Sequence, residues 1–290
     1  MTPPEYSPVL SGPRPWWRRG SLCLGLIFTI GSAVIGLLAP VLAPGDPAAM
    51  GQLSERLLEP SSAHLLGTDL LGRDVLVRLV HGARTSLLVG WVSVLAAMVC
   101  GTAIGMAAGL GPRWLDRLLM SLTDLFMAFP RIFLVLLLVS LTSPSLVLIM
   151  VVLGVTGWMG VARLVRAEAL SLREREFVTA ARGLGLTPWQ VAWRHILPGL
   201  WPTIIVATSL RVGGAILSES FLSYLGLGVQ EPMVSWGGMI QMGRANLVDG
   251  WWLATLPGVA LALTVIGYNL LGESLREWLD PRRQGGRSDG

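Results

Sequence analysis

Residues 168–200 read EALSLREREFVTAARGLGLTPWQVAWRHILPGL, and this stretch lies between two apolar runs at 144–167 and 201–222. It is too long for a simple turn and rich in residues that favour helices. The runs on either side are long enough to cross a bilayer, whereas the stretch itself carries repeated charges. The sequence therefore predicts a structured segment in water between two membrane spans.

The spacing inside the stretch predicts an amphipathic helix. At about 100° per residue, Leu170, Phe177, Ala181 and Leu184 fall on one face. The opposite face carries Glu168, Arg175, Thr179 and Arg182. An apolar ridge of this kind fits a groove on another protein or the surface of a bilayer, and the residues alone favour neither.

Two glycines and a Thr-Pro pair predict how the stretch is divided. Gly183 and Gly185 suit the end of a first helix. Thr187 followed by Pro188 suits the cap and first position of a second helix, which we expect to end before Pro198.

Outward from this stretch, apolar runs of about 20 residues predict six membrane-spanning helices. They are 21–43, 85–111, 118–141, 144–167, 201–222 and 251–275. The chain is 52% hydrophobic and only 14% charged, with a mean hydropathy of +0.62. We therefore expect an all-α polytopic membrane protein, with a lipid membrane as its surroundings.

The arginines predict the orientation of these spans. Fifteen of the 22 fall on one side if both termini lie together, and only Arg56, Arg73, Arg78 and Arg244 fall in the opposite loops. Because positively charged loops stay in the cytoplasm, both termini and residues 168–200 are expected there. The chain then divides into a cytoplasmic tail (1–20), the first span, an external loop (44–84), a five-helix core (85–279) with a second external loop (223–250), and a cytoplasmic tail (280–290).

Composition excludes several functions. All 22 basic residues are arginine, so the chain can build neither a Walker phosphate loop nor a lysine Schiff base. Cys23 and Cys100 lie in apolar runs, which fits small buried side chains better than a disulfide or metal pair. The three histidines are widely separated, and no basic run with interleaved aromatics occurs, so we expect neither a metal site nor nucleic-acid binding.

Two spans contain residues with a specific expected role. Gly101, Gly105 and Gly109 form a ladder along one face of the second span, which would let another helix approach closely. Glu219 lies near the outer end of the fifth span, where it suits either a structural hydrogen bond or a place in a transport path. Arg211 lies eight residues earlier, too far along the helix for a direct salt bridge with Glu219.

The stretch at 168–200 also resembles a known motif. It contains, in order, Glu176, Thr179, Ala180, Ala181, Gly185, Leu197 and Pro198. Two alanines, a glycine four positions after the second, and a later Leu-Pro resemble the EAA loop of binding-protein-dependent ABC transporter permeases. Thr179 departs from the pattern, because it stands where that loop usually has its glutamate, and Glu176 is the nearest acid.

Further motifs in matching order resemble the second permease subunit of dipeptide, oligopeptide and nickel importers. They are HLLGTDLLGRDVLVRLVHGARTSL (64–87), DLFMAFP (124–130), LSYLGLG (222–228), SWGG (235–238) and LDPR (279–282). The resemblance implies a bacterial inner-membrane subunit that pairs with a homologous second permease, two cytoplasmic ATPases and an external substrate-binding protein. It implies no cofactor on this chain, with ATP bound by the ATPases, and it assigns the seven residues of the EAA-like motif to ATPase coupling.

Short peptides are the expected substrate, with nickel or a metal-chelate complex as the alternative. A secondary transporter or channel that works without ATP is the hypothesis from another class, but the chain has few charges within its spans and no clear repeat between its halves. A membrane enzyme would need a convergent group of nucleophile, acid or metal ligands, and none is evident in the sequence.

Overall fold

The computed structural model describes residues 16–141 and 145–279. Regular structure within these ranges is helical, as predicted, with no β-strand and one isolated bridge between Thr68 and Asp74. The α-helices are α1 (Trp16–Leu37), α2 (Ala39–Leu42), α3 (Val75–Leu110), α4 (Arg113–Met127), α5 (Arg131–Ser140), α6 (Leu146–Val155), α7 (Trp158–Arg173), α8 (Glu176–Gly183), α9 (Pro188–Val191), α10 (Leu197–Tyr224), α11 (Trp236–Gly243) and α12 (Trp252–Leu279). Of the expected tails, only residues 16–20 are described, and they already belong to α1.

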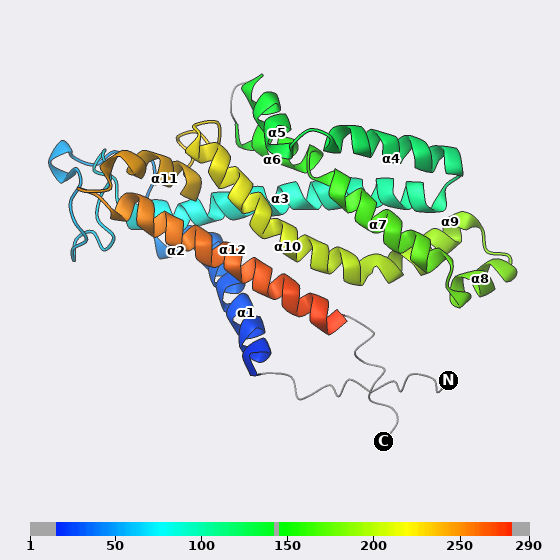
Figure 1. The fold of residues 1–290 in the computed structure, drawn as a ribbon. Helices are drawn as coiled ribbons and strands as arrows, with labels where there is room; N and C mark the ends of the chain where they lie inside the picture. The colour runs from blue at the N-terminus through cyan, green and yellow to red at the C-terminus, as the bar shows by residue number, and fades with distance from the viewer. Residues whose placement is uncertain (1–15, 142–144, 280–290) are drawn as a thin grey trace, which may run out of the picture.

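Helix α3 runs through the centre of the bundle (Figure 1). Asp74 caps its start, because the Asp74 carboxylate accepts hydrogen bonds from the backbone N–H groups of Leu76 and Val77. The helix therefore begins at Val75 rather than at residue 85, and its first turns occupy the end of the loop expected at 44–84. At ~1.5 Å per residue it is about 54 Å long, well beyond the hydrocarbon core of a bilayer.

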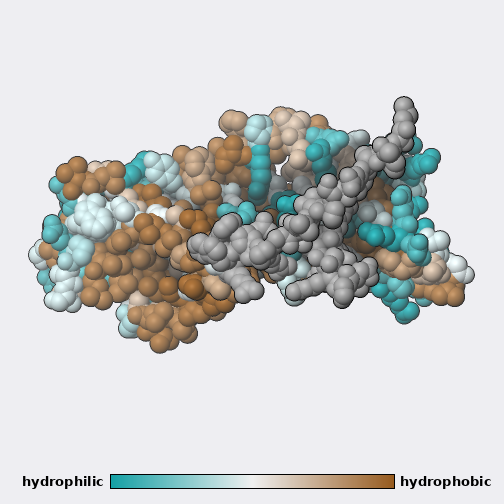
Figure 2. Space-filling view, turned by 60° about the horizontal axis from the view of Figure 1, so that its bottom comes forward, coloured by the Kyte–Doolittle hydropathy of each residue, from teal (hydrophilic) through white to brown (hydrophobic). Residues whose placement is uncertain are grey.

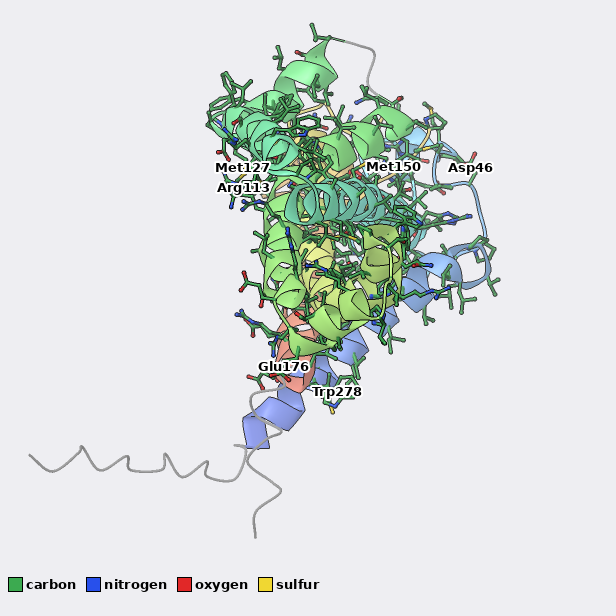
Figure 3. The ribbon with its side chains drawn as sticks, turned by 90° about the vertical axis from the view of Figure 1, so that its right-hand side faces the viewer. Asp46, Arg113, Met127, Met150, Glu176 and Trp278 are labelled. Carbon is green, nitrogen blue, oxygen red and sulfur yellow. The ribbon has the colours of Figure 1, made fainter. Side chains whose placement is uncertain are left out.

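The other helices surround α3 in a fixed order. Figure 1 shows α4 and α5 on one side of α3 and α1 and α12 on the other, and Figure 3, viewed from the α8 end, shows the same arrangement. The segment between α2 and α3 gathers with α11 at one end of the molecule, whereas α8 and α9 lie at the opposite end. The two ends therefore lie on opposite sides of the apolar bundle.

The glycine ladder on α3 packs against α7. A Cβ atom at Gly101 would lie 2.4 Å from Cβ of Val161, and one at Gly105 would lie 2.6 Å from the carbonyl oxygen of Ala162. At Gly109 the nearest atom would be Cβ of Ala169 at 3.1 Å. The predicted close helix approach is thus confirmed, and its partner is the helix that leads into residues 168–200.

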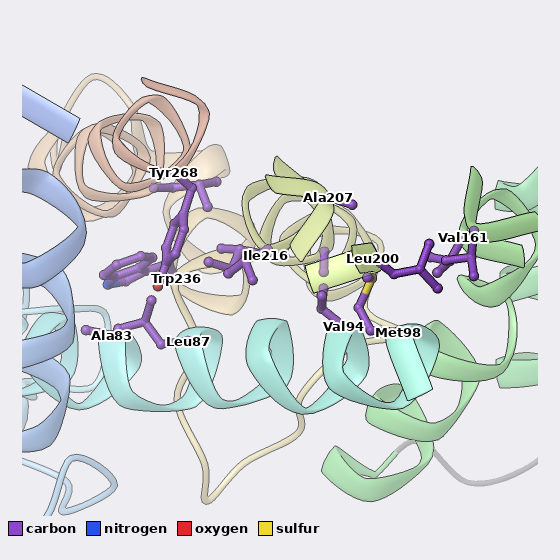
Figure 4. Close-up of a cluster of buried hydrophobic side chains, with 14 of the residues drawn as sticks. Ala83, Leu87, Val94, Met98, Val161, Leu200, Ala207, Ile216, Trp236 and Tyr268 are labelled. Carbon is purple, nitrogen blue, oxygen red and sulfur yellow. The ribbon is translucent and has the colours of Figure 1, made fainter. Parts of the chain in front are cut away.

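The main hydrophobic core lies between α3 and the helices that cover it. Figure 4 shows that Leu87 and Val94 of α3 point toward the helices that carry Ile216 (α10) and Trp236 (α11), and the four residues belong to one hydrophobic cluster. All four side chains are buried. This packing joins the helices at one end of the molecule to those that cross its middle.

The third span, expected as one helix over 118–141, is bent. Within the described residues five helical stretches are long and apolar enough to cross a membrane, and α4 with α5 makes a sixth only as a pair bent by 79°. Pro130 explains the bend, because it lacks a backbone N–H and disfavours helical geometry at Phe129. The fourth span is also divided, since α6 ends at Val155 and α7 begins at Trp158.

The second helix of the 168–200 stretch does not end before Pro198. Helix α9, a π-helical turn at Ala192–Ile196 and α10 follow one another directly as far as Tyr224. Pro198 lies in the first turn of α10, directly after the π-helical turn has shifted the hydrogen-bond register. A proline there does not remove an established α-helical bond, so the helix continues.

Large apolar side chains cover much of the outer surface. Ile27, Leu95 and Phe133 are each more than half exposed, and Figure 2 shows apolar residues over the left part of one face and polar residues gathered toward the α8 end at the right. Cys23 and Cys100 are also exposed, contrary to the expectation that they are buried. A continuous apolar surface of this kind is suited to lipid or to another subunit.

Candidate functional site

Helix α8 is a separate short helix at one end of the molecule. The chain leaves helical geometry at Arg175, the residue before α8, which has extended backbone angles. After α8, Gly185 has a φ of +86°, in the left-handed region that favours glycine. The side chains and backbone N–H groups of Thr187 and Gln190 then bond each other reciprocally and start α9. The predicted sequence of helix, tight turn and second helix start is confirmed.

The apolar face predicted from Leu170, Phe177, Ala181 and Leu184 does not form one buried ridge. Ala181 is buried, but Phe177 is 47% exposed and Leu184 is 83% exposed. The break between α7 and α8 interrupts the helical phase, so Leu170 does not continue the face of α8. Val178 and Ala181 hold α8 against the rest of the chain, while Phe177 and Leu184 face outward.

Two tryptophans of the following segment extend this outward surface. Trp189 and Trp193 are at least half exposed and form an edge-to-face pair with ring centroids 5.3 Å apart. The ring of Phe177 lies 6.4 Å from that of His195 in the π-helical turn. We call Phe177, Leu184, Trp189 and Trp193 the α8 patch. The two tryptophan rings contact each other, and the Phe177 ring contacts His195, so each aromatic ring of the patch is held by a neighbouring ring.

The residues of the EAA-like motif lie on or directly after the segment that carries this patch. Exposed members are Glu176, Thr179, Ala180, Gly185 and Pro198; Ala181 is buried and Leu197 is partly buried. The Thr179 hydroxyl donates to the carbonyl of Arg175, 3.4 Å away within the same helical turn. Thr179 carries no charge, but Arg175, Glu176 and Arg182 are exposed around it, so the surface combines apolar and charged side chains.

Glu219 is enclosed by serines near the opposite end of α10. Its side chain is fully buried, and its carboxylate accepts hydrogen bonds from the hydroxyls of Ser86 (3.2 Å), Ser220 (3.3 Å) and Ser223 (2.6 Å). The backbone N–H of Trp236 donates to the same Ser86 hydroxyl. This geometry favours the structural hydrogen-bond interpretation, because the network joins α3, α10 and α11.

The motif at 64–87 forms an ion-pair network at the same end, in which the two arginines and Asp69 are buried and Glu231 is half exposed. Arg73 Nε donates to Asp69 Oδ2 at 2.7 Å, and Arg73 Nη1 donates to Glu231 Oε1, also at 2.7 Å. Arg78 Nη2 reaches Glu231 Oε1 at 3.2 Å. Burial alone would raise the pKa of Glu231, but the hydrogen bond and charge of Arg73, with those of Arg78, hold that pKa below its usual value. The network ties the loop before α3 to the segment before α11.

A cavity of about 360 Å³ opens beside the middle of α3 and α10. Its lining residues are Ser93, Val94, Ala97, Arg131, Leu153, Gly157, Leu210, Arg211, Gly214, Ala215 and Ser218. Glu219 is not among them. The volume lies within the range of roughly 300 to 1,000 Å³ that is typical of small-molecule sites.

The two arginines of this cavity were missed as site residues by reasoning from the sequence. They come from helices far apart in the chain, and only the bend at Pro130 and the break between α6 and α7 bring them to one space. A signal was present, since Arg131 and Arg211 are cations within apolar runs with no acid three or four residues away. Arg211 makes no ion pair with Glu219 in the described residues, as predicted.

Comparison with known proteins places these features in a family. The family described as "Binding-protein-dependent transport system inner membrane component" matches residues 101–285. The dipeptide transport system permease protein DppC of Alkalihalophilus pseudofirmus is 37% identical over 293 residues, covering 97% of this chain and 96% of that protein. The glutathione transport system permease protein GsiD of Pectobacterium atrosepticum is 38% identical over 274 residues, covering 93% and 91%.

The fold also resembles that of solved transporter structures. An inward-facing structure of the MetNI methionine ABC transporter matches with a TM-score of 0.59 and 20% identity, covering 71% of this chain and 97% of the matched chain. The family consists of membrane transport components rather than enzymes, as expected. Because the family match covers more than half of the chain and the relatives align over nearly all of it, the chain belongs to the binding-protein-dependent transport system inner membrane components.

Proposed function

We propose that this subunit forms half of the translocation path of an ATP-driven importer for short peptides. A homologous second permease subunit would supply the other half. Support for peptides comes from the relatives named as dipeptide and glutathione transport permeases, which match the chain over almost its full length. Nickel or a metal chelate is the alternative substrate for the same architecture.

The observation that carries the proposal is the α8 patch. In water, an exposed surface of Phe177, Leu184 and two tryptophans is unfavourable unless a partner covers it. Ala180 and the Gly185 turn have little bulk, so a partner backbone can approach α8 closely. Two cytoplasmic ATPases, one for each permease, fit this role, and they would bind all of the ATP.

The helices around α8 provide a route from ATP to the cavity. Val178 and Ala181 anchor α8, and the helical segment that begins at Pro188 continues without a gap into α10. A push on α8 and α9 would therefore move α10, and with it Arg211 and the cavity wall, as a rigid body. The path would alternate between states open to the outside and to the cytoplasm.

The proposed orientation places α8 and both termini in the cytoplasm of a bacterial cell. The loop before α3 and the segment around α11 would then face the external binding protein. The ion pairs of Arg73 with Asp69 and Glu231 would hold this surface rigid. The arginine-rich segments on the α8 side agree with this orientation.

Uptake into vesicles tests the function. The chain would be reconstituted with its second permease, ATPases and binding protein, and uptake of a labelled dipeptide measured with ATP and with a non-hydrolysable analogue. We expect uptake only with ATP, and its loss in Leu184→Asp, which places a charge in the α8 patch; Arg276→Gln, exposed at the end of α12, is the control. Uptake by this chain alone without ATP would support a secondary transporter or channel instead.

A further inference from the structure

The cavity beside α3 and α10 lies near the middle of the membrane-spanning bundle. Ser93 to Ala97 occupy the middle of the 36-residue α3, and Leu210 to Ser218 occupy the middle of α10. The remaining lining comes from the start of α5 and from the break between α6 and α7. Interrupted helices at this depth are tolerated where they line a cavity, which is the arrangement seen in transporter substrate sites.

Two guanidinium groups project to this cavity and are held in place by the broken helices. Arg131 Nη2 donates to the carbonyl of Leu153 at 3.0 Å, and its Nε donates to the Thr156 hydroxyl at 3.4 Å. Arg211 Nη1 donates to the carbonyl of Gly157 at 3.4 Å. These acceptors all belong to the segment around the α6–α7 break, so both cations are oriented by the same backbone interruption.

Neither guanidinium has an anionic partner among the described residues. The ion pairs of the described residues include neither Arg131 nor Arg211. No carboxylate is among the described residues that line the cavity. Among the described residues, Arg131 Nη1 and Arg211 Nη2 donate no hydrogen bond to protein atoms, so both nitrogens can bind a ligand. Two like charges at membrane depth are costly, and such residues in other transporters mark the path of a charged solute.

We propose that Arg131 and Arg211 form a subsite for the carboxylate of the transported solute. Guanidinium groups suit this role because their N–H donors match the two oxygens of a carboxylate. The inference rests on the proposed importer function and adds to it that the substrate class is anionic at one end, as a peptide with a free C-terminus is. The Ser93 and Ser218 hydroxyls, which also line the cavity, can supply weaker polar contacts.

Binding to the assembled complex tests the subsite. The probes are a labelled dipeptide with a free C-terminal carboxylate and the same dipeptide as its C-terminal amide, titrated against the permease–ATPase complex without the binding protein. We expect the wild-type complex to bind the free acid at least about tenfold more tightly than the amide. Arg131→Gln and Arg211→Gln should abolish that preference by weakening acid binding alone.

Two further variants keep the result interpretable. Arg211→Lys retains the charge and should retain most of the preference for the acid, whereas Arg276→Gln removes an exposed arginine outside the cavity and should bind both probes as wild type does. Equal affinity of the wild-type complex for acid and amide would overturn the subsite. So would loss of the second permease from the purified Arg→Gln complexes, because the arginines would then pair with that subunit.

Failure of the importer function would look different. In that case the wild-type complex would show no ATP-dependent uptake of either probe. If uptake of the free acid is intact and the Arg→Gln variants transport acid and amide as wild type does, only the carboxylate subsite is wrong.

Discussion

Gly185 is the residue on which the geometry of the α8 turn depends. Its φ of +86° is strained for any residue with a Cβ atom, although no neighbouring atom would contact that Cβ within 4 Å. The constraint is therefore the backbone conformation rather than crowding. Gly183, two residues earlier, also has open space around it but does not have a positive φ.

This difference predicts the behaviour of two matched variants. Gly185→Val should cost about 1 to 3 kcal/mol locally, because a β-branched residue must adopt the left-handed region. The turn would shift, so we expect normal membrane insertion but weaker retention of the ATPases on purification. Gly183→Val should retain them. Normal ATPase binding and uptake by Gly185→Val would show that coupling does not depend on this turn.

At the scale of elements, α3 packs closely against α7 along the glycine ladder of Gly101, Gly105 and Gly109. Their contact matters because α7 leads directly to α8 and begins directly after Gly157, whose carbonyl accepts a hydrogen bond from Arg211. Gly101 has no room for a side chain, since its Cβ would meet both Val161 and the carbonyl of Trp158 within 3 Å. Gly258 on α12, by contrast, has no atom within 4 Å of a Cβ position.

The packing predicts that Gly258 tolerates a larger side chain and that Gly101 does not. Gly101→Val should destabilise the subunit by about 1 to 3 kcal/mol, because overpacking forces α3 and α7 apart. Gly258→Val should have little effect. Thermal unfolding of the purified proteins, followed by tryptophan fluorescence, measures the difference, and equal melting temperatures for the two variants would contradict the packing argument.

At the scale of the whole molecule, the polar ends and the apolar middle define how the subunit sits in a bilayer. The loop before α3 and helix α8 lie at opposite ends of the bundle (Figure 1). With an α3 helix of about 54 Å between them, both ends extend beyond the hydrocarbon core. The arginine distribution predicts that the α8 end lies in the cytoplasm.

Cysteine labelling tests this orientation. After replacement of Cys23 and Cys100 by serine, a single cysteine would be introduced as Ser62→Cys in the loop before α3 or as Gly183→Cys in α8; both positions are exposed. A membrane-impermeant maleimide should label Ser62→Cys in intact cells and Gly183→Cys only in inside-out vesicles. The reverse pattern would place α8 outside the cell and exclude its contact with cytoplasmic ATPases.

Local patterns were sufficient to predict much of this protein. Apolar runs predicted the approximate positions of the spans, because each span must satisfy its own backbone hydrogen bonds in lipid, but they did not predict that the third is a bent pair of helices. The glycine at position 185 and the Thr187 cap were readable for the same reason, because the relevant energies involve only neighbouring residues. Even so, the single amphipathic face predicted for residues 170–184 fails, because the chain leaves helical geometry at Arg175. The helix end predicted before Pro198 is also wrong, because α10 continues through it.

What only the tertiary structure decided is which distant residues share a space. Arg131 and Arg211 are 80 positions apart by number, and each alone is one charged residue in an apolar run. They meet because α5 bends away from α4, α6 breaks from α7, and the carbonyls at that break hold both guanidiniums. The sequence by itself determined that helices cross a membrane and present a short helix in water, because lipid and water act on each segment separately. The cavity and its paired charges depend on the packing of several segments at once, and packing is a property of the folded chain.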